Sequence, residues 1–290
     1  MITSTSNAQI KELLRLQKKN RAREEAGVFI VEGTRMAAEI PPDRIVKLYV
    51  SESYAAKEKA AAVNVSHGTG KTLSGSLLNA GHTFQEEVLA DSVFARVSDT
   101  KTPQGVMAVV KRQEYTMADI LRVNSDERKN ISDVHQTPGE PHVLVLDNLQ
   151  DPGNLGTIFR TAEAAGATGL LLSRDCVDIY NPKVIRSTMG AVFRLPFLYT
   201  DDLPGAIGEL KAAGIRVYAA HLEGENAYDK EDYRSGCAFL IGNEGNGLRD
   251  ETVRCADCLI RIPMQGQTES LNAAVAAAVL MFEVGRQRRS

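Results

Sequence analysis

The chain has 290 residues, of which 43% are hydrophobic and 24% charged, and its formal net charge is −3. This length suits two domains that each bury a core, and nothing in the composition argues against globular folding. No apolar run reaches the roughly 20 residues of a membrane span, and the first residues have neither the basic nor the apolar region of a signal peptide, so we expect a cytoplasmic protein with no membrane partner.

The start of the chain is predicted to form one basic helix from Asn7 to about Arg23, because apolar residues recur there at helical spacing after a capping residue. Six basic residues accompany a single acidic one, Glu12: Lys11, Arg15, Lys18, Lys19, Arg21 and Arg23. Such a run suits contact with an RNA phosphate backbone. It equally suits a solvated helix face with i,i+4 ion pairs, since Glu24 and Glu25 follow, and the charges alone do not decide between the two.

Alternating strand and helix patterns predict an α/β domain at residues 1–112. The strand-like runs are Val28–Val31, Ile45–Val50 and Gly105–Val110, and the helical ones are Ser53–Ala62 and Ser74–Ala80. Residues 113–141 are mostly polar and are expected to form a linker with one short helix.

Residues 142–290 are predicted to form a second α/β domain. Apolar runs of strand length alternate there with helical runs, from Val143 to Val284. Such alternation is typical of a mainly parallel sheet with helices on both faces.

Three stretches of the second domain set polar residues among glycines after an apolar run: Asp147–Ala165, Leu240–Glu251 and Ile262–Ala274. Loops at the carboxyl ends of parallel strands converge on one crevice, where ligands bind. The pattern therefore predicts a ligand site built from these loops.

A metal site is not expected. Cys255 and Cys258 form a lone C-x-x-C, while a zinc site needs two further ligands at matching spacing. Cys176 and Cys237 have no such spacing, so we interpret the four thiols as buried or half-buried.

The three stretches together resemble the motifs of the SpoU family of RNA 2′-O-ribose methyltransferases, in the SPOUT class. Asp151-Pro-Gly-Asn-Leu-Gly-Thr-Ile-Phe-Arg-Thr-Ala162 is similar to the first motif, Ile241-Gly-Asn-Glu-Gly-Asn-Gly-Leu248 to the second, and Ile262-Pro-Met with Glu269-Ser-Leu-Asn-Ala-Ala274 to the third. Upstream, Phe29–Gly33 and Ser98–Val106 resemble an L30e-like substrate-binding domain found in many members.

The resemblance implies a parallel-sheet domain with a deep trefoil knot, preceded by an L30e-like α/β domain. It further implies that S-adenosylmethionine binds in the knot. The cofactor-binding residues would be Gly242, Ile262, Leu271, Leu222, Asn243 and Met264. We expect Gly242 and Gly245 to let the backbone approach the cofactor.

The resemblance also assigns the catalytic residues Arg160, Asn154, Glu244, Ser270 and Asn272. Arg160 would act as the general base on the ribose hydroxyl. Because arginine is effectively always protonated, Arg160 could instead clamp the target phosphate and orient the hydroxyl. Asn154 and Asn272 would hold Arg160 or the ribose, and Glu244 would orient a cation or bind backbone amides.

Family members are homodimers through the second domain, which implies the same for this chain. The last helix is apolar all round, as expected of a helix that packs against a partner subunit, although burial within one subunit would give the same pattern.

The implied activity is methylation of RNA riboses, with 23S ribosomal RNA favoured over transfer RNA and guanosine as a candidate target. The alternatives are a transfer RNA 2′-O-methyltransferase, a base methyltransferase of the wider class, and a non-catalytic RNA-binding ribosome-assembly factor.

Overall fold

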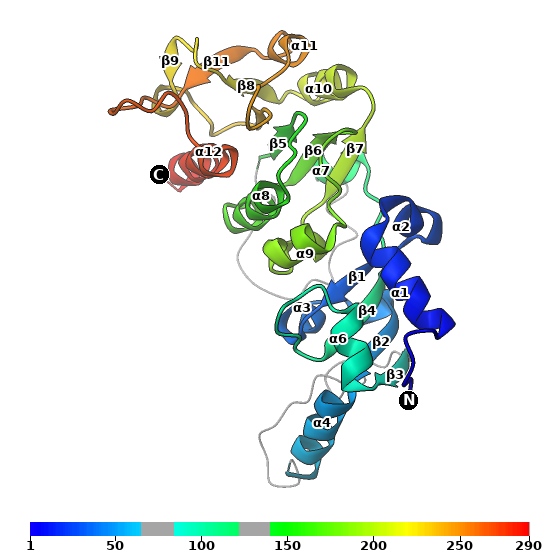
Figure 1. Ribbon diagram of the computed structural model, residues 1–290. Coiled ribbons are helices and arrows are strands. Elements are labelled where there is room, and N and C mark those ends of the chain that lie inside the picture. Colours follow the sequence, from blue (N-terminus) through cyan, green and yellow to red (C-terminus); the bar gives the residue numbers. More distant parts are fainter. Residues whose placement is uncertain (65–83, 122–139, 290) are drawn as a thin grey trace. The chain divides into compact units, whose positions relative to one another are not determined.

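The computed structural model describes residues 1–64, 84–121 and 140–289 (Figure 1). The expected helix at 74–80 and most of the expected linker lie outside these residues. The chain divides into two compact units. The first comprises Met1–Gln113 and Asp178–Phe193, and the second comprises Glu114–Val177 and Arg194–Ser290.

The first unit is built on a mixed four-stranded sheet in the order β1-β4-β2-β3. β4 pairs antiparallel with β1 and β2, and β3 pairs parallel with β2. The strands are β1 (Val28–Glu32), β2 (Ile45–Ser51), β3 (Gln85–Leu89) and β4 (Val106–Lys111). The helical elements are α1 (Ala8–Lys18), α2 (Asn20–Ala26), α3 (Thr34–Ala38), η1 (Pro42–Arg44), α4 (Glu52–Asn64), α6 (Asp91–Val97), α9 (Pro182–Thr188) and η4 (Ala191–Phe193).

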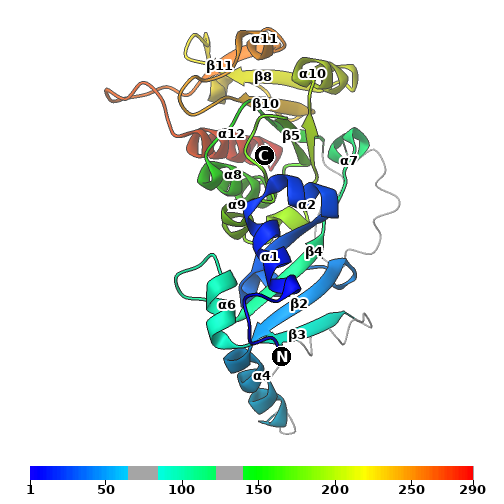
Figure 2. The same ribbon diagram turned by 45° about the vertical axis from the view of Figure 1, so that its right-hand side comes forward.

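The single basic helix expected at the start of the chain is two helices, α1 and α2 (Figure 2). The helix breaks at Lys19, whose backbone is extended. Arg23 explains the break, because its guanidinium turns back to donate to the carbonyls of Leu16 (2.7 Å) and Gln17 (3.1 Å) near the end of α1. Carbonyls at a helix end need such donors, and a basic side chain can supply them.

Residues Asp178–Phe193 pack with the first unit, although the sequence pattern places them within the second domain. The ring of Tyr180 lies 4.6 Å from that of Phe29 on β1, and the guanidinium of Arg112 lies 4.3 Å from the Tyr180 ring centroid. Asp178 forms an ion pair with Arg23. These contacts join residues far apart in the sequence, which a local pattern does not reveal.

The second unit is built on a seven-stranded sheet in the order β7-β6-β5-β10-β8-β11-β9, and every strand pair is parallel. The expected parallel sheet is confirmed. Its strands are β5 (His142–Leu146), β6 (Gly169–Ser173), β7 (Phe197–Thr200), β8 (Arg216–Ala220), β9 (Asn226–Ala227), β10 (Cys237–Ile241) and β11 (Cys258–Arg261).

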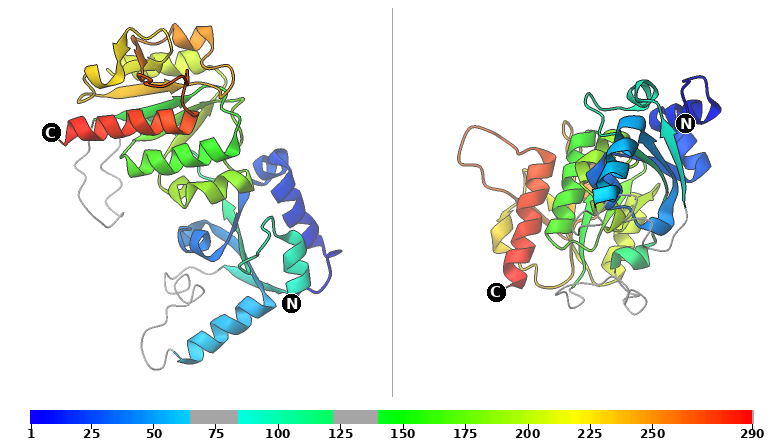
Figure 3. Two further views of the ribbon diagram at one scale, coloured as in Figure 1. Left: turned by 60° about the vertical axis from the view of Figure 1, so that its left-hand side comes forward. Right: turned by 90° about the horizontal axis from the view of Figure 1, so that it is seen from below.

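Helices cover both faces of this sheet. The helical elements are α7 (Met117–Leu121), α8 (Pro152–Ala164), α10 (Leu203–Ala212), η5 (Tyr228–Lys230), α11 (Asp250–Val253) and α12 (Ala273–Arg288). Apolar residues of α7 and α10 share a core with one face, whereas α8 and α12 lie side by side on the other (Figure 3). The trefoil knot implied by the resemblance stays a prediction.

α8 begins at Pro152, within the first of the three stretches that resemble the family's motifs. Asp151 caps it by accepting from the backbone N–H of Asn154 at 2.8 Å, and Pro152 occupies the first turn, where its missing N–H costs nothing. Asn154 therefore lies in the first turn of a helix, which holds its side chain at a defined place.

Candidate active site

A cavity of about 960 Å³ opens at the carboxyl ends of β8, β10 and β11. Its walls are residues 220–223, the loop 241–248 after β10, residues 260–264, and residues 269–273 with Ala276 at the start of α12. All six residues expected to bind the cofactor line it: Gly242, Ile262, Leu271, Leu222, Asn243 and Met264. Three of the five expected catalytic residues, Glu244, Ser270 and Asn272, line it too.

The loop 242–248 folds back on itself. Asn243 and Gly247 exchange two backbone hydrogen bonds of 2.9 Å, and the Asn243 side chain accepts from the amides of Gly245 (2.9 Å) and Asn246 (3.0 Å). A Cβ at position 242 would lie 2.2 Å from the carbonyl carbon of Gly247. Glycine was expected at position 242 to let the backbone approach the cofactor. The structure shows another reason for glycine there, because the backbone of the loop itself leaves no room for a side chain.

Glu244 joins this loop to the start of α8. Its carboxylate accepts from the backbone amides of Gln150 (3.1 Å) and Asp151 (3.0 Å) and from the side-chain amide of Asn154 (2.9 Å). Partial burial opposes ionisation, but the hydrogen bond from Asn154 and those from backbone amides outweigh it and lower the pKa of Glu244. Of the two roles expected for Glu244, the structure shows the binding of backbone amides.

Asn154 links Glu244 to the third motif. While its Nδ2 donates to Glu244, its Oδ1 accepts from Nδ2 of Asn272 at 2.9 Å. Asn272 also caps α12, because its Oδ1 accepts from the amides of Ala274 (2.9 Å) and Val275 (3.3 Å). One chain of hydrogen bonds, Glu244–Asn154–Asn272, therefore connects all three motif stretches at the cavity wall. Among the described residues, the two asparagines bond each other, and Asn154 also bonds Glu244, whereas neither bonds Arg160.

Arg160 does not line the cavity of its own chain. It is an exposed residue of α8, six positions after Asn154, which is about one and two-thirds helical turns. Within the described part of the chain its guanidinium has neither an ion pair nor a hydrogen bond. The structure thus brings together four of the five expected catalytic residues and leaves Arg160 apart.

Ser270 lies on the segment between β11 and α12, which extends away from the rest of the second unit in Figure 2. Its side chain is exposed at the cavity rim. Loops that line binding sites are commonly of this kind, with few buried contacts.

The expected RNA-binding residues divide into three groups. Lys11, Lys18 and Lys19 are exposed. Arg15 and Arg21 are exposed but form ion pairs with Glu12 and Glu25. Arg23 is buried, with only 3% of its surface exposed, so assigning it to RNA contact was wrong.

The cavity fits a cofactor such as S-adenosylmethionine. Its volume lies in the range of small-molecule sites. Apolar residues that could contact an adenine ring line the cavity, among them Leu222, Ile262 and Leu271. Its three acidic residues, Glu223, Glu244 and Glu269, outnumber the one arginine, Arg261. This balance suits a sulfonium cation better than a nucleotide carrying phosphates.

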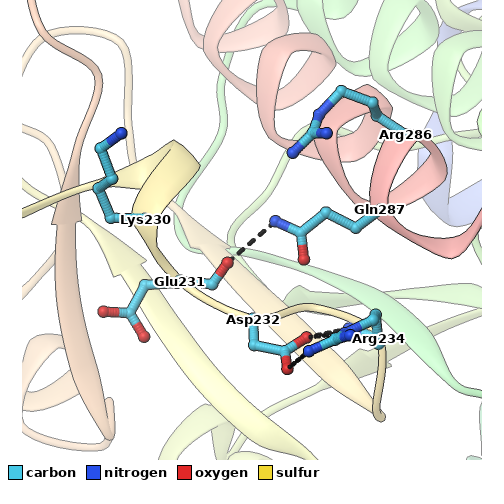
Figure 4. A pocket seen from close by; sticks show the side chains of 6 residues that line it. All are labelled: Lys230, Glu231, Asp232, Arg234, Arg286 and Gln287. Carbon is cyan, nitrogen blue, oxygen red and sulfur yellow. Dashed lines mark hydrogen bonds and ion pairs between the residues drawn. The ribbon is translucent and has the colours of Figure 1, made fainter. Parts of the chain in front are cut away.

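A second hollow, of about 280 Å³, is lined by charged and polar side chains near the end of α12 (Figure 4). Its groups bond one another: Gln287 donates to the backbone carbonyl of Glu231 at 2.9 Å, and Arg234 forms an ion pair of 2.6 Å with Asp232. Because these groups bind one another, we interpret this hollow as a structural feature and not as a cofactor site.

The described residues hold no group of three His, Cys, Asp or Glu that could bind a metal ion. None of their helices has the length and apolar character needed to span a bilayer.

Sequence reasoning missed several residues that build the site. Asn148 has a left-handed backbone (φ 55°) and offers its carbonyl to Nδ2 of Asn243 at 2.8 Å. Asparagine tolerates this conformation better than most residues, which is the one signal in the sequence. The ion pair between Asp147 and Arg249 gave no local signal, since 102 positions separate the two residues.

Comparisons with known proteins match both parts of the chain. The model of the SpoU rRNA Methylase family matches residues 141–282, and that of the MRM3-like substrate binding domain matches residues 7–108. The chain is 30% identical to the 23S rRNA (guanosine(2553)-2′-O)-methyltransferase RlmP of Bacillus subtilis strain 168, over 98% of each chain.

Solved structures show the same similarity. The AdoMet-bound rRNA methyltransferase from Sinorhizobium meliloti is 31% identical, with a TM-score of 0.73 over 98% of this chain and 97% of that one. The SpoU methyltransferase AviRb from Streptomyces viridochromogenes, in complex with AdoMet, is 26% identical, with a TM-score of 0.78 over 98% and 99%.

Proposed function

Because this chain belongs to the SpoU rRNA Methylase family, we propose that it transfers a methyl group from S-adenosylmethionine to a ribose 2′-hydroxyl of 23S ribosomal RNA, with guanosine as the target. The observation that carries this proposal is the Glu244–Asn154–Asn272 chain beside the cavity. The relative RlmP, whose name states this reaction, matches along nearly the whole chain. Such an enzyme works where ribosomes are assembled, in the cytoplasm.

The cofactor supplies an electrophilic methyl group on a sulfonium. The 2′-oxygen forms the new bond to carbon as the carbon–sulfur bond breaks, and the hydroxyl proton must leave. The residues of the chain have two tasks: to hold the hydroxyl in line at near-attack distance and to favour loss of its proton. Asn154 and Asn272, fixed by each other and by Glu244, provide rigid amides at the cavity wall for the first task.

The second task falls to Arg160, which requires a second subunit. α12 leaves Val275 and Phe282 each 49% exposed, on the same side of the helix as the half-buried Val279. Exposed apolar faces of this kind mark protein interfaces. A homodimer formed through this face would bury it and could bring Arg160 of the partner subunit to the cavity.

Arginine stays protonated at neutral pH, so we assign Arg160 to clamping the phosphate next to the target ribose. Its planar fork binds phosphate oxygens in pairs. The phosphate or a water molecule then accepts the proton. The exposed Lys11, Lys18 and Lys19 of the first unit would bind the RNA backbone elsewhere.

Labelled S-adenosylmethionine and unmodified 23S ribosomal RNA test the activity, and mass spectrometry of nuclease digests locates the methyl group. Ribose methylation of 23S RNA supports the proposal. Methylation of transfer RNA, methylation of a base, or no methylation despite RNA binding would each refute it and favour the corresponding alternative.

Subunit mixing tests the shared site. Arg160→Ala and Asn272→Ala should each be inactive alone. After subunits are exchanged, a mixed dimer contains one site with both intact residues, so about a quarter of wild-type activity should return. No recovery in a mixture shown to contain mixed dimers would refute the role of Arg160 across the interface.

A further inference from the structure

Arg249 ties together three loops at the carboxyl ends of β5, β6 and β10. It directly follows the loop 242–248 that lines the cavity. One nitrogen of its guanidinium lies 3.0 Å from Oδ1 of Asp147, after β5, and 2.6 Å from Oδ2 of Asp175, after β6. Arg249 itself does not line the cavity.

Asp147, which forms this ion pair with Arg249, is completely buried. Its Oδ2 accepts from the backbone N–H of Arg249 at 3.0 Å. Its Oδ1 receives no hydrogen bond from any described group, so the Arg249 guanidinium is the charge that compensates it. A buried carboxylate is costly without such a partner.

Asp175 closes the connection back to the first motif. Its Oδ1 accepts from the Ser173 hydroxyl at 2.6 Å, and the same Ser173 oxygen accepts from the backbone N–H of Asn148 at 2.8 Å. Asn148 in turn holds Asn243, at the other end of the cavity loop. The loop 242–248 is therefore anchored at one end through Asn243 and at the other through Arg249.

We propose that Arg249 is a positioning residue for the cofactor cavity, setting the place of the loop 242–248 and thereby the affinity for S-adenosylmethionine. This inference rests on the proposed function only in its choice of ligand. A single terminal nitrogen of Arg249 contacts both carboxylates, whereas the side chain of lysine is one bond shorter and ends in a point charge. Arg249→Lys should therefore restore only part of what Arg249→Ala loses.

The test measures the dissociation constant of S-adenosylmethionine by calorimetry for the full-length protein and its variants. Arg249→Ala should raise it about tenfold, the factor expected for loss of a hydrogen bond to a charged group. Asp175→Asn, which keeps the shape of the side chain and leaves Asp147 paired, should raise it about threefold. Arg174→Ala is the matched control. Arg174 also contacts an aspartate at this edge of the sheet, Asp201 at 3.1 Å, and should change the constant less than twofold.

Hydrogen exchange of the unliganded protein provides a readout that does not depend on the ligand. The backbone amides of Gly245, Asn246 and Gly247 should exchange faster in Arg249→Ala than in wild type. Their exchange rates should be unchanged in Arg174→Ala. Unaltered affinity and exchange in folded Arg249→Ala would overturn the proposal, even if its melting temperature fell. Should Arg249→Ala not fold, unaltered values in Asp175→Asn and Arg249→Lys would overturn it. A wild-type protein that binds no S-adenosylmethionine would instead refute the proposed function, and exchange would still decide on Arg249.

Discussion

Replacing Asn154 with aspartate places two carboxylates where the structure has an amide and a carboxylate. The side chains have nearly the same shape, so one oxygen of the introduced carboxylate can still accept from Asn272. The other oxygen would face Glu244 Oε1 at the 2.9 Å of the present hydrogen bond. Two carboxylates so close cannot both ionise without strong repulsion, and one of them retains a proton to higher pH.

The magnitude follows from the charges and their exposure. Two unit charges about 4 Å apart interact by about 4 kcal/mol at an effective dielectric constant of 20 and by about 1 kcal/mol in bulk water. Because Glu244 is exposed, we take a middle value of about 2 kcal/mol, to which the lost hydrogen bond adds about 1 kcal/mol. At pH 8 the second unit should lose about 3 kcal/mol of unfolding free energy, which lowers its melting temperature by about 6–12 °C.

The loss should shrink as the pH falls. In the variant the folded-state pKa of the pair exceeds the unfolded value, so proton uptake stabilises the folded state as the pH decreases toward 5. Melting curves of Asn154→Asp and wild type between pH 8 and 5 measure the difference. Asn154→Ala is the control, because it loses both hydrogen bonds without adding a charge and its deficit should not vary with pH. A deficit of Asn154→Asp that is equally constant would refute the placement of Glu244 beside Asn154.

Three further substitutions test other parts of the second unit. Gly242→Ala should abolish measurable S-adenosylmethionine binding in calorimetry, because its Cβ would overlap the backbone of Gly247. Gly245→Ala is the control and should bind normally, because a Cβ added there would lie 3.6 Å from the nearest atom. Burial lowers the pKa of His142 to about 3, so the unfolded chain takes up a proton below about pH 6.5 that the folded chain does not. The free energy of unfolding therefore decreases as the pH decreases. Urea unfolding at pH 7 and pH 5 should show that His142→Leu makes this decrease smaller by about 2 kcal/mol. Phe282→Arg should leave the subunit folded but monomeric in sedimentation and inactive in methyl transfer, and a dimer would contradict the proposed interface.

The parallel sheet and the cavity could be predicted because their signals are local. A continuous apolar run followed by glycines and polar residues marks the end of a buried strand, and parallel strands end at one edge. Gly242 lies on one such segment and Ile262 and Leu271 on another, and the structure gathers them around one cavity.

Other features depend on residues that are distant in sequence. Arg23 seemed equivalent to its basic neighbours, but Asp178, 155 positions away, draws it into the interior. The pairing of Asp147 with Arg249 likewise spans 102 positions. The start of α8 could have been predicted from the sequence, since an aspartate followed by a proline, as at Asp151 and Pro152, is a typical helix beginning.

Because Asp178–Phe193 belong to the first unit, the two units of this enzyme cannot be separated by a single cut in the chain. A fragment ending near residue 113 would lack the aromatic ring of Tyr180 and the carboxylate of Asp178, leaving Phe29 partly uncovered and a buried guanidinium without its counter-charge. Exchange of recognition modules between relatives, in the laboratory or in evolution, must therefore carry this insert along or replace its contacts. Stretches of the gene that encode the two units thus alternate along its length.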